Sequence, residues 1–277
     1  MTQKAKASLF RAMHTEGRML VLPNAWDVIS AKLFEEAGFP AVATTSAGIA
    51  NALGYPDGQV ISREEMLFIV RRIANSLEVP VSADIEAGYG ANAIGEVLKT
   101  IQGVLDSGAV GINLEDAGEE QGTLVEKSLQ VERIQAIRQL AAASGVPLVI
   151  NARTDPYFFP HLTPQEQFEI AVDRANAYFA AGADSLFVPI VTDRMTISNL
   201  VKAIEGPLNV LVLPGVPPLA ELEEMGVRRV SMGSGGHRAT LAVVRRIAKE
   251  FLEQGTYASL FNDSVPYQEV NALLAKQ

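Results

Sequence analysis

Two carboxylates separated by one residue stand at the end of an apolar run in the stretch VPVSADIEAGYG, residues 79–90. They are Asp84 and Glu86. Side chains at positions i and i+2 of a strand point to the same side. Two negative charges directed at one place raise each other's pKa unless a positive charge lies between them. The spacing therefore predicts a cation beside these two groups, either a side chain of the protein or a bound ion.

Two later apolar runs end in the same alternation of polar residues. The run AVGINLED places Asn113 and Glu115 on one side of a strand, and PLVINARTD places Asn151 and Arg153 on one side. If all three strands point these residues to one place, three carboxylates, two amides and one guanidinium meet there. Carboxylate oxygens with room for water suit Mg²⁺ or Mn²⁺, and a guanidinium offers a fork for a carboxylate or a phosphonate. The pattern predicts a metal site that also takes an anionic substrate.

Each of these residues, taken singly, also has a structural interpretation. Acidic residues at strand ends often cap the following helix, which is an alternative role for Asp116 and Asp155. Arg153 has the alternative of a simple ion pair with Glu115. The matching side-chain direction at three strand ends favours a functional site over three separate structural roles.

Two segments between the apolar runs have the composition of functional loops. The segment TTSAGIANALGYPDG, residues 44–58, is rich in small and polar residues and is interpreted as a long loop. Long loops in compact domains are uncommon unless they are functional. We expect it to bring Asp57 and the backbone amides of Ser46 and Ala47 over the mouth of the site. A locally satisfied Pro-Asp-Gly turn is the alternative. EDAGEEQGTLVEKS, residues 115–128, is interpreted either as a mobile lid or as a solvated loop.

The elements that must position these residues alternate regularly along the chain. Short runs rich in Val, Ile and Ala are each followed by a stretch with helical spacing, and most runs are continuously apolar, as in parallel strands buried on both faces. Ser62 and Glu65 form a capping box that starts one helix, and Thr163 with Pro164 starts another. The eight apolar runs begin at Met19, Ala41, Val79, Ala109, Pro147, Ala183, Leu208 and Arg228.

Eight strand–helix units in a chain of 277 residues predict an α/β fold, a (β/α)8 TIM barrel, since such barrels usually need roughly 250 residues. The rival is a doubly wound open sheet, which is disfavoured by the even spacing and by the lack of a Gly-x-Gly-x-x-Gly turn after the first strand. We see no linker, so residues 1–277 are interpreted as a single barrel domain with a C-terminal helical extension. Active sites of such barrels form at the C-terminal strand ends, where the polar residues gather.

Composition excludes several classes of function. The net charge is −9, with charges interspersed and no basic run, which argues against a nucleic-acid partner. The chain has no cysteine, which rules out disulfides, thiolate metal sites and a cysteine nucleophile. No apolar run is long enough for a membrane span and no signal-peptide core is present, so we expect a cytoplasmic protein with no membrane partner. The amphipathic segment 267–274 needs a partner for its apolar side, such as another subunit.

The chain resembles the isocitrate lyase/phosphoenolpyruvate mutase superfamily. The resemblance extends from about residue 20 to residue 238 and rests on TTSAGIANALGYPDG, ADIEAGYG, GINLED and NARTD, which occur in the family's order. It implies a (β/α)8 barrel whose last helix is exchanged between subunits, in a homodimer or a homotetramer. It also implies Mg²⁺ as cofactor and a small 2-oxo acid or phosphonate as substrate, with a C–C or P–C bond made or broken next to the 2-oxo group.

The resemblance implies a role for each matched residue. Asp84 is the expected direct Mg²⁺ ligand, and Glu86, Glu115 and Asp57 hold the metal through its water molecules. Many members have Asp where this chain has Glu86, which is a mild departure. Arg153 is expected to bind the substrate carboxylate, and catalytic roles are assigned to Asp57, Glu115 and Arg153. The predicted substrate-binding residues are Thr45, Ser46, Ala47, Asp84, Asn113, Asn151 and Arg153.

The lid segment departs from the family. Isocitrate and methylisocitrate lyases carry a Lys-Lys/Arg-Cys-Gly-His lid with a catalytic cysteine, whereas the segment here reads AGEEQG. Phosphoenolpyruvate mutase has a lysine in this lid, at a position that aligns roughly with Gln121, and Lys127 is nearby but displaced. Proton delivery by a lid cysteine is therefore impossible in this chain. Relatives without these lids include oxaloacetate decarboxylases, oxaloacetate hydrolases, phosphonopyruvate hydrolases and dimethylmalate-type lyases.

Three functions are compatible with these features. The first is Mg²⁺-dependent cleavage of a C–C bond in a small 2-oxo or 2-hydroxy dicarboxylate through a pyruvate-like enolate. The second is phosphonomutase or phosphonopyruvate hydrolase chemistry, ranked lower because Glu119 and Glu120 stand in the lid where a phosphonate favours positive charge. The third is a non-catalytic barrel that binds a metabolite. His237 is a further candidate base or a helix-start residue, and Trp26 either lines the mouth or packs in the core.

Overall fold

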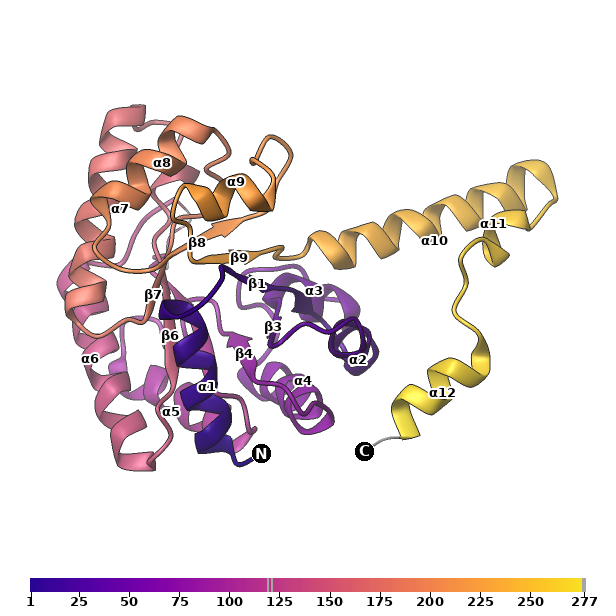
Figure 1. Ribbon diagram of the computed structural model, residues 1–277, viewed down its shortest axis with the longest axis horizontal. Helices are drawn as coiled ribbons and strands as arrows, with labels where there is room; N and C mark the ends of the chain where they lie inside the picture. Colours follow the sequence, from indigo (N-terminus) through magenta and orange to yellow (C-terminus); the bar gives the residue numbers. More distant parts are fainter. Residues whose placement is uncertain (119, 121, 276–277) are drawn as a thin grey trace.

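Nine parallel strands form one sheet that curves into a nearly closed barrel (Figure 1). The computed structural model describes residues 1–118, 120 and 122–275. Neighbouring strands pair in the order β1-β9-β8-β7-β6-β5-β4-β3-β2. The strands are β1 (Leu20–Leu22), β2 (Asn24–Ala25), β3 (Val42–Thr44), β4 (Val81–Asp84), β5 (Gly111–Glu115), β6 (Val149–Arg153), β7 (Ser185–Phe187), β8 (Leu208–Leu211) and β9 (Arg229–Ser231).

β1 and β2 are two halves of one predicted strand. Pro23 lies between them and interrupts the hydrogen-bond ladder, because proline has no backbone N–H. β1 pairs with β9, β2 pairs with β3, and the amide of Ala43 donates to the carbonyl of Pro23 at 2.8 Å. The two ends of the sheet order therefore belong to one chain segment. The predicted (β/α)8 barrel is confirmed, and the open doubly wound alternative is wrong.

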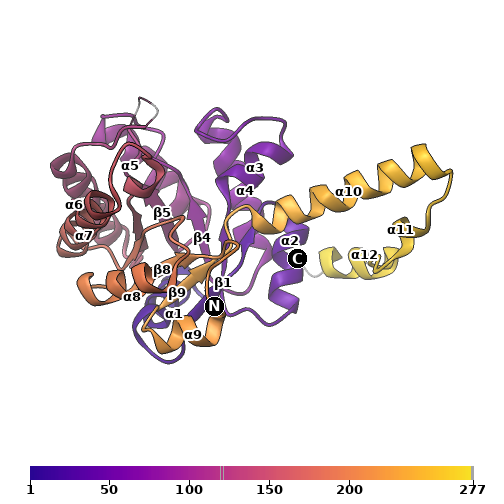
Figure 2. The ribbon, with the colours of Figure 1, turned by 90° about the horizontal axis from the view of Figure 1, so that it is seen from above.

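Helices surround the sheet (Figure 2). Two predicted helix starts are confirmed, because Ser62 with Glu65 and Thr163 with Glu166 each form a reciprocal capping box. The helices are α1 (Gln3–Thr15), α2 (Val28–Glu36), α3 (Ser46–Ala52), α4 (Arg63–Ser76), α5 (Ile94–Asp106), α6 (Lys127–Ser144), α7 (Pro164–Ala180), α8 (Arg194–Ala203), α9 (Leu219–Glu224), α10 (Gly235–Gln254), α11 (Ala258–Phe261) and α12 (Tyr267–Ala275), with a 3-10 turn η1 (Pro156–Phe158).

Side chains on the two faces of the strands differ: those that point outward form an apolar layer under the helices, and many of those that point inward are polar. Outward-pointing side chains such as Ala83, Ile112 and Ile150 are fully buried against the helices, and each buried isoleucine contributes about 1.5–3 kcal/mol. Phe10 on α1 is buried with Leu20 at the N-terminal end of the barrel. The opposite end, where the strands finish, is left to polar residues.

The segment after β3 differs from the expected loop. Residues 46–52 form the helix α3, so the expectation of a continuous loop over 44–58 was wrong for this part. Thr45 is the N-cap, and its hydroxyl accepts a hydrogen bond from the amide of Gly48. The small residues that suggested a loop allow a helix to start directly at the strand end.

The C-terminal residues form an arm that leaves the barrel. α10 extends away from the strands, α11 folds back beside its far end, and α12 lies apart from α10, back toward the barrel (Figure 1). Leu252 on α10 is 87% exposed and Tyr267 on α12 is 84% exposed, whereas Leu273 is buried. α12 contacts α2. None of the described helices has the length and apolarity needed to cross a membrane.

Candidate active site

Asp84, the last residue of β4, is held by neutral donors from two neighbouring elements. The amide and the hydroxyl of Ser46 donate to its Oδ2 at 2.9 and 2.8 Å, and Nδ2 of Asn113 donates to its Oδ1 at 3.0 Å. Nδ2 of Asn151 donates in turn to Oδ1 of Asn113 at 2.8 Å. Asp84, Asn113 and Asn151 are paired positions on three adjacent strands. These bonds orient the Asp84 carboxylate without neutralising its charge.

Two further carboxylates lie beside Asp84. Oε2 of Glu86 accepts from the amide of Gln59 at 2.7 Å, and Oε1 accepts from the hydroxyl of Tyr89 at 3.1 Å. Burial, together with the negative charges of Asp84 and Asp57, raises the pKa of Glu86 to about 7. Burial and the charge of Asp84 also raise the pKa of Asp57. The three carboxylates therefore repel one another across one small space.

The backbone around Glu86 is in a left-handed conformation. φ is 50° at Glu86, 55° at Tyr89 and 45° at Ala91, and it is 58° at Gln59, which donates to Glu86. Residues with a side chain seldom adopt such angles, and each costs on the order of 1 kcal/mol. Strain of this kind persists where the surrounding structure fixes it, and it is concentrated at functional sites.

Arg153 at the end of β6 is held from several sides. Its Nη1 lies 2.8 Å from Oε2 of Glu115, and its Nε and Nη2 lie 2.6 and 2.7 Å from the two oxygens of Asp155. The guanidinium carbon is 5.4 Å from the ring centre of Phe158 and 5.8 Å from that of Phe187. Burial opposes the charged form, but the two carboxylates raise the pKa of Arg153 well above its ordinary value. The alternative of an ion pair with Glu115 is therefore realised, and the guanidinium is a fixed cation at the mouth.

No ion pair among the residues that the structure describes involves Asp57, Asp84 or Glu86. A bound cation would offset their repulsion, and their oxygen atoms suit a hard ion such as Mg²⁺ or Mn²⁺. Within the described part of the chain, no three His, Cys, Asp or Glu side chains converge closely enough to hold a metal by themselves. Because Mg²⁺ usually keeps several water ligands and takes only one or two carboxylates, the donor set fits that ion.

The start of α3 brings the predicted anion-anchoring residues to the mouth. Both donors of Ser46 are occupied by Asp84, and the hydroxyl of Thr45 serves the amide of Gly48. The amide of Ala47 lies in the first turn of α3, where backbone amides have no partner within the helix. A Cβ at Gly48 would lie 2.6 Å from Cγ2 of Thr45, so glycine is required for this close approach. Of the three residues, Ala47 therefore has the amide best placed for a ligand.

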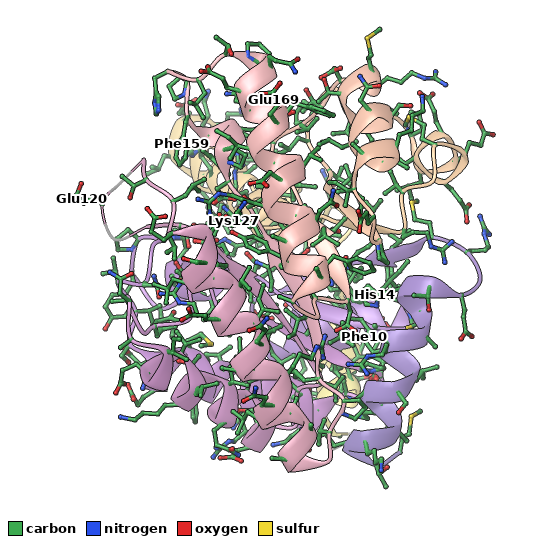
Figure 3. The ribbon with its side chains drawn as sticks, turned by 90° about the vertical axis from the view of Figure 1, so that its left-hand side faces the viewer. Phe10, His14, Glu120, Lys127, Phe159 and Glu169 are labelled. Atoms are coloured by element: carbon green, nitrogen blue, oxygen red, sulfur yellow. The ribbon has the colours of Figure 1, made fainter. Side chains whose placement is uncertain are left out.

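After β5, described residues at the two ends of the lid segment pair with each other. An antiparallel bridge joins Ala117 to Leu124, and Figure 3 shows Glu120 at the outer edge of this loop, away from the barrel. Lys127, at the start of α6, forms an ion pair with Asp173 at 2.7 Å, so its ammonium group is engaged outside the carboxylate cluster. Two other predicted lid positions lie outside the described residues: Glu119 and Gln121.

Asp116 belongs to a separate structural network. It points away from Glu115 and is fully buried, and its Oδ2 accepts from the hydroxyls of Tyr178 and Thr154 at 2.6 and 2.7 Å. Nη1 of Arg174 lies 3.1 Å from the same oxygen, and the amide of Asp155 donates to Oδ1 at 3.1 Å. Neither Asp116 nor Asp155 caps a helix through its side chain, so this alternative for both residues is wrong.

A cavity of about 100 Å³ leads from the mouth into the barrel, and sequence reasoning missed several of its residues. Asp84 and Arg153 line its upper part. The signal for the missed residues was present: each is a polar residue at an inward position of an otherwise apolar strand. Trp26 and His237 do not line this cavity, and their rings pack edge to face at 5.2 Å. The missed polar residues are Asn24, Ser82, Asn209, Arg229 and Ser231.

Comparisons with known proteins agree with the fold and the motifs. The family model described as phosphoenolpyruvate phosphomutase matches residues 10–252. The chain belongs to the isocitrate lyase/phosphoenolpyruvate mutase superfamily. A crystal structure from Burkholderia cenocepacia J2315, of a protein described as a lyase/mutase, has 36% identity and a TM-score of 0.91, and the match covers 99% of this chain and 97% of that one. The chain is an enzyme of this superfamily.

Two characterised members of the superfamily are also similar to the chain. The oxaloacetate decarboxylase of Bradyrhizobium sp. (strain BTAi1 / ATCC BAA-1182) is 30% identical over 89% of this chain and 84% of the relative. The crystal structure of 2,3-dimethylmalate lyase has 27% identity and a TM-score of 0.83, over 99% of this chain and 95% of that one. The superfamily therefore includes relatives that act on different small carboxylic acids.

Proposed function

We propose that this protein is a Mg²⁺-dependent lyase that cleaves a C–C bond in a small 2-oxo or 2-hydroxy dicarboxylate through a pyruvate-like enolate. The observation that carries the proposal is the electrostatic repulsion among Asp57, Asp84 and Glu86, which form no ion pair among the described residues, at the mouth that also holds the fixed guanidinium of Arg153. Carboxylates without a cation favour a metal, and a guanidinium next to them favours an anionic ligand.

The residues of the chain would divide the work as follows. Asp84 would hold Mg²⁺ directly, and Glu86, Asp57 and Glu115 would hold its water ligands. When bound, Mg²⁺ supplies a Lewis acid at the 2-oxo oxygen, where charge develops as the adjacent bond breaks. Arg153 orients the substrate carboxylate beside it, because Asp155 and two phenyl rings fix the direction of its guanidinium.

The first turn of α3 completes the proposed binding site. The amide of Ala47 would donate to the carboxylate or carbonyl end of the substrate, with Thr45 and Ser46 fixing the start of the helix. Asn113 would act from below by orienting Asp84, and Asn151 by orienting Asn113.

The test is an assay of Asp84→Ala in the presence of Mg²⁺ with oxaloacetate and with 2,3-dimethylmalate. We expect wild type to turn over one of these substrates and the variant to lose at least about 10³-fold of kcat/KM, or about 4 kcal/mol of transition-state stabilisation. Asp173→Ala is the matched control, because Asp173 is an exposed acid on α7 whose one ion pair among the described residues is with Lys127. Equal activity of Asp84→Ala and wild type would overturn the assignment.

Two alternative functions are distinguished when phosphonopyruvate is added to the substrates of this assay. A phosphonomutase or phosphonopyruvate hydrolase would act on phosphonopyruvate, and the hydrolase would release phosphate from it. The family model described as phosphoenolpyruvate phosphomutase favours keeping this alternative. A non-catalytic barrel would bind a 2-oxo acid in a Mg²⁺-dependent manner and turn over none of the substrates.

We also propose that the C-terminal arm is exchanged between subunits of a homodimer or homotetramer. α10 carries exposed Val244, Phe251 and Leu252, and the segment beyond it carries exposed Phe261 and Tyr267. An isolated arm with so many apolar side chains in water is unfavourable, and a second subunit would cover them.

A further inference from the structure

The interior of the barrel below the mouth is polar, whereas barrels of this type are usually filled by branched apolar side chains. Ser82, Asn151, Asn209 and Arg229 point inward and are each only 1–2% exposed. The pairing of β8 with β9 places Asn209 beside Arg229. These four residues line the same 100 Å³ cavity as Asp84 and Arg153, so the space below the mouth continues down to Arg229.

Arg229 is a buried cation without an anionic partner among the described residues. No ion pair in that part of the chain involves it, and its Nε has no hydrogen-bond partner. Its Nη1 lies 3.3 Å from Nε2 of His14. Burial lowers the pKa of Arg229 to about 9, and the charge of Asp84 opposes this fall. A buried guanidinium in this situation is unfavourable unless an anion reaches it.

His14 does not supply that anion. Its Nδ1 lies 2.8 Å from the carbonyl oxygen of Phe10, and because a carbonyl only accepts, Nδ1 carries the proton. Nε2 is then a neutral acceptor for Arg229. Burial and the charge of Arg229 lower the pKa of His14 to about 3, so the ring is uncharged at neutral pH. Figure 3 shows His14 and Phe10 on α1.

Other polar atoms around the cavity also lack partners. Oγ of Ser82 and the Oδ1 atoms of Asn151 and Asn209 are buried without a hydrogen bond. Asn209 can turn its amide group without loss, because Oγ of Ser231, 3.1 Å from Nδ2, can either accept from Nδ2 or donate to Oδ1. The cavity therefore offers Arg229 and the hydroxyl of Ser82, together with a reorientable amide, as donors to one group.

We propose that Arg229 binds the second, distal carboxylate of a substrate whose 2-oxo end lies between Asp84 and Arg153. This assignment rests on the function proposed above and adds to it the residue that would recognise the second carboxylate of the dicarboxylate. A cavity of about 100 Å³ has room for about three atoms of the size of a water molecule, which is the number of non-hydrogen atoms in a carboxylate. Water would satisfy the polar atoms but would not compensate the charge of Arg229.

The experiment compares the binding of two ligands by calorimetry in the presence of Mg²⁺. Pyruvate and 3,3-difluorooxaloacetate share the 2-oxo acid end, but only the second has a distal carboxylate. We expect Arg229→Met to weaken binding of 3,3-difluorooxaloacetate roughly 10- to 100-fold, as for a lost hydrogen bond to a charged group, and to leave pyruvate binding within about threefold. Arg228→Met is the matched control, because the Arg228 side chain donates to the backbone carbonyls of His14, Glu16 and Gly17 and is not among the residues that line the cavity.

A second variant keeps the assignment testable if Arg229→Met does not fold. Asn209→Asp would place a carboxylate beside Arg229, so we expect a higher melting temperature than wild type and the same selective loss of 3,3-difluorooxaloacetate binding. Equal weakening of both ligands, or of neither, in the folded variants would overturn the role of Arg229 alone. Failure of wild type to bind either ligand would overturn the proposed function, and this assignment with it.

Discussion

Carboxylates at the ends of two neighbouring strands differ in what they contact: Asp116 after β5, and the pair Asp84 and Glu86 at the end of β4. Asp116 is surrounded by Tyr178, Thr154 and Arg174, so its charge has a cation and three further donors. Among the described residues, Asp84 and Glu86 accept from amides and hydroxyls and form no ion pair, and the charge of Asp84 helps to raise the pKa of Glu86. The first group is complete without a ligand, and the second is not.

This difference separates a structural acid from a binding site better than residue type does. A buried carboxylate that is paired and hydrogen-bonded contributes to the fold, and removing it leaves its partners unsatisfied. A cluster of carboxylates without a cation destabilises the ligand-free protein. Binding of a cation removes the repulsion and stabilises the folded state. The predictions below test this contrast in order of the expected effect.

The largest expected effect is on the stability of Asp116→Asn. The substitution leaves the guanidinium of Arg174 buried without a carboxylate, so we expect the free energy of unfolding to fall by about 3–5 kcal/mol. Urea unfolding followed by circular dichroism measures this. Asp84→Asn in metal-free protein is the control, and its free energy of unfolding should stay equal or rise, because the change removes repulsion. A similar loss in both variants would contradict the contrast.

Arg153→Lys tests the cation at the mouth. Lysine keeps the charge but loses the planar fork that Asp155 and the two phenyl rings hold in place. We expect kcat/KM to fall about 10²-fold, or about 2.7 kcal/mol, in steady-state kinetics with the substrate found for wild type. Arg194→Lys on the exposed face of α8 should change nothing. An unchanged kcat/KM in Arg153→Lys would show that the fork does not orient the substrate.

The sequence allowed the fold and one side of the site to be predicted because both depend on short-range periodicity. The period of two along a strand places Asp84, Asn113 and Asn151 on one face, and the parallel register then brings them together. The capping box of Ser62 with Glu65 and the Thr163–Pro164 pair marked two helix starts for the same local reason. Nothing in these patterns depends on how distant loops meet.

Features that depend on long-range packing could not be predicted. The meeting of Asp57 with Asp84 depends on the path of the chain after α3, and the left-handed turn at Glu86 depends on Gln59 from that same segment. From the sequence alone, Arg229 in the run RRVSMG resembles a surface residue, because its burial depends on the closure of the barrel. Only the packing of α1 beneath the barrel shows that Arg229 faces inward with His14 as its neighbour.

Glu86→Gln makes the repulsion at the mouth measurable through pH. The pKa of Glu86 in the folded protein is about 7, above its ordinary value of 4.5. The stabilisation from its proton is therefore fully present below about pH 4.5 and is lost as the pH rises through 7. Because glutamine stays neutral, we expect metal-free Glu86→Gln to exceed wild type by on the order of 2 kcal/mol at pH 8. The two proteins should converge at pH 4, and a difference independent of pH would show that Glu86 does not experience this repulsion.

The smallest expected change in the free energy of unfolding comes from a substitution in the C-terminal arm. There the groups without a partner are exposed apolar side chains rather than charges. Leu252 on α10 is 87% exposed, so within one subunit a charge there should change the free energy of unfolding by less than about 0.5 kcal/mol. If a second subunit covers this face, Leu252→Glu places a charge in an apolar interface and should shift the assembly to monomers in light scattering. Glu253→Gln, the neighbouring exposed position, is the control and should keep the wild-type mass. A wild-type protein that is already monomeric, or a Leu252→Glu variant that keeps the oligomer, would mean that the arm is not an intersubunit element.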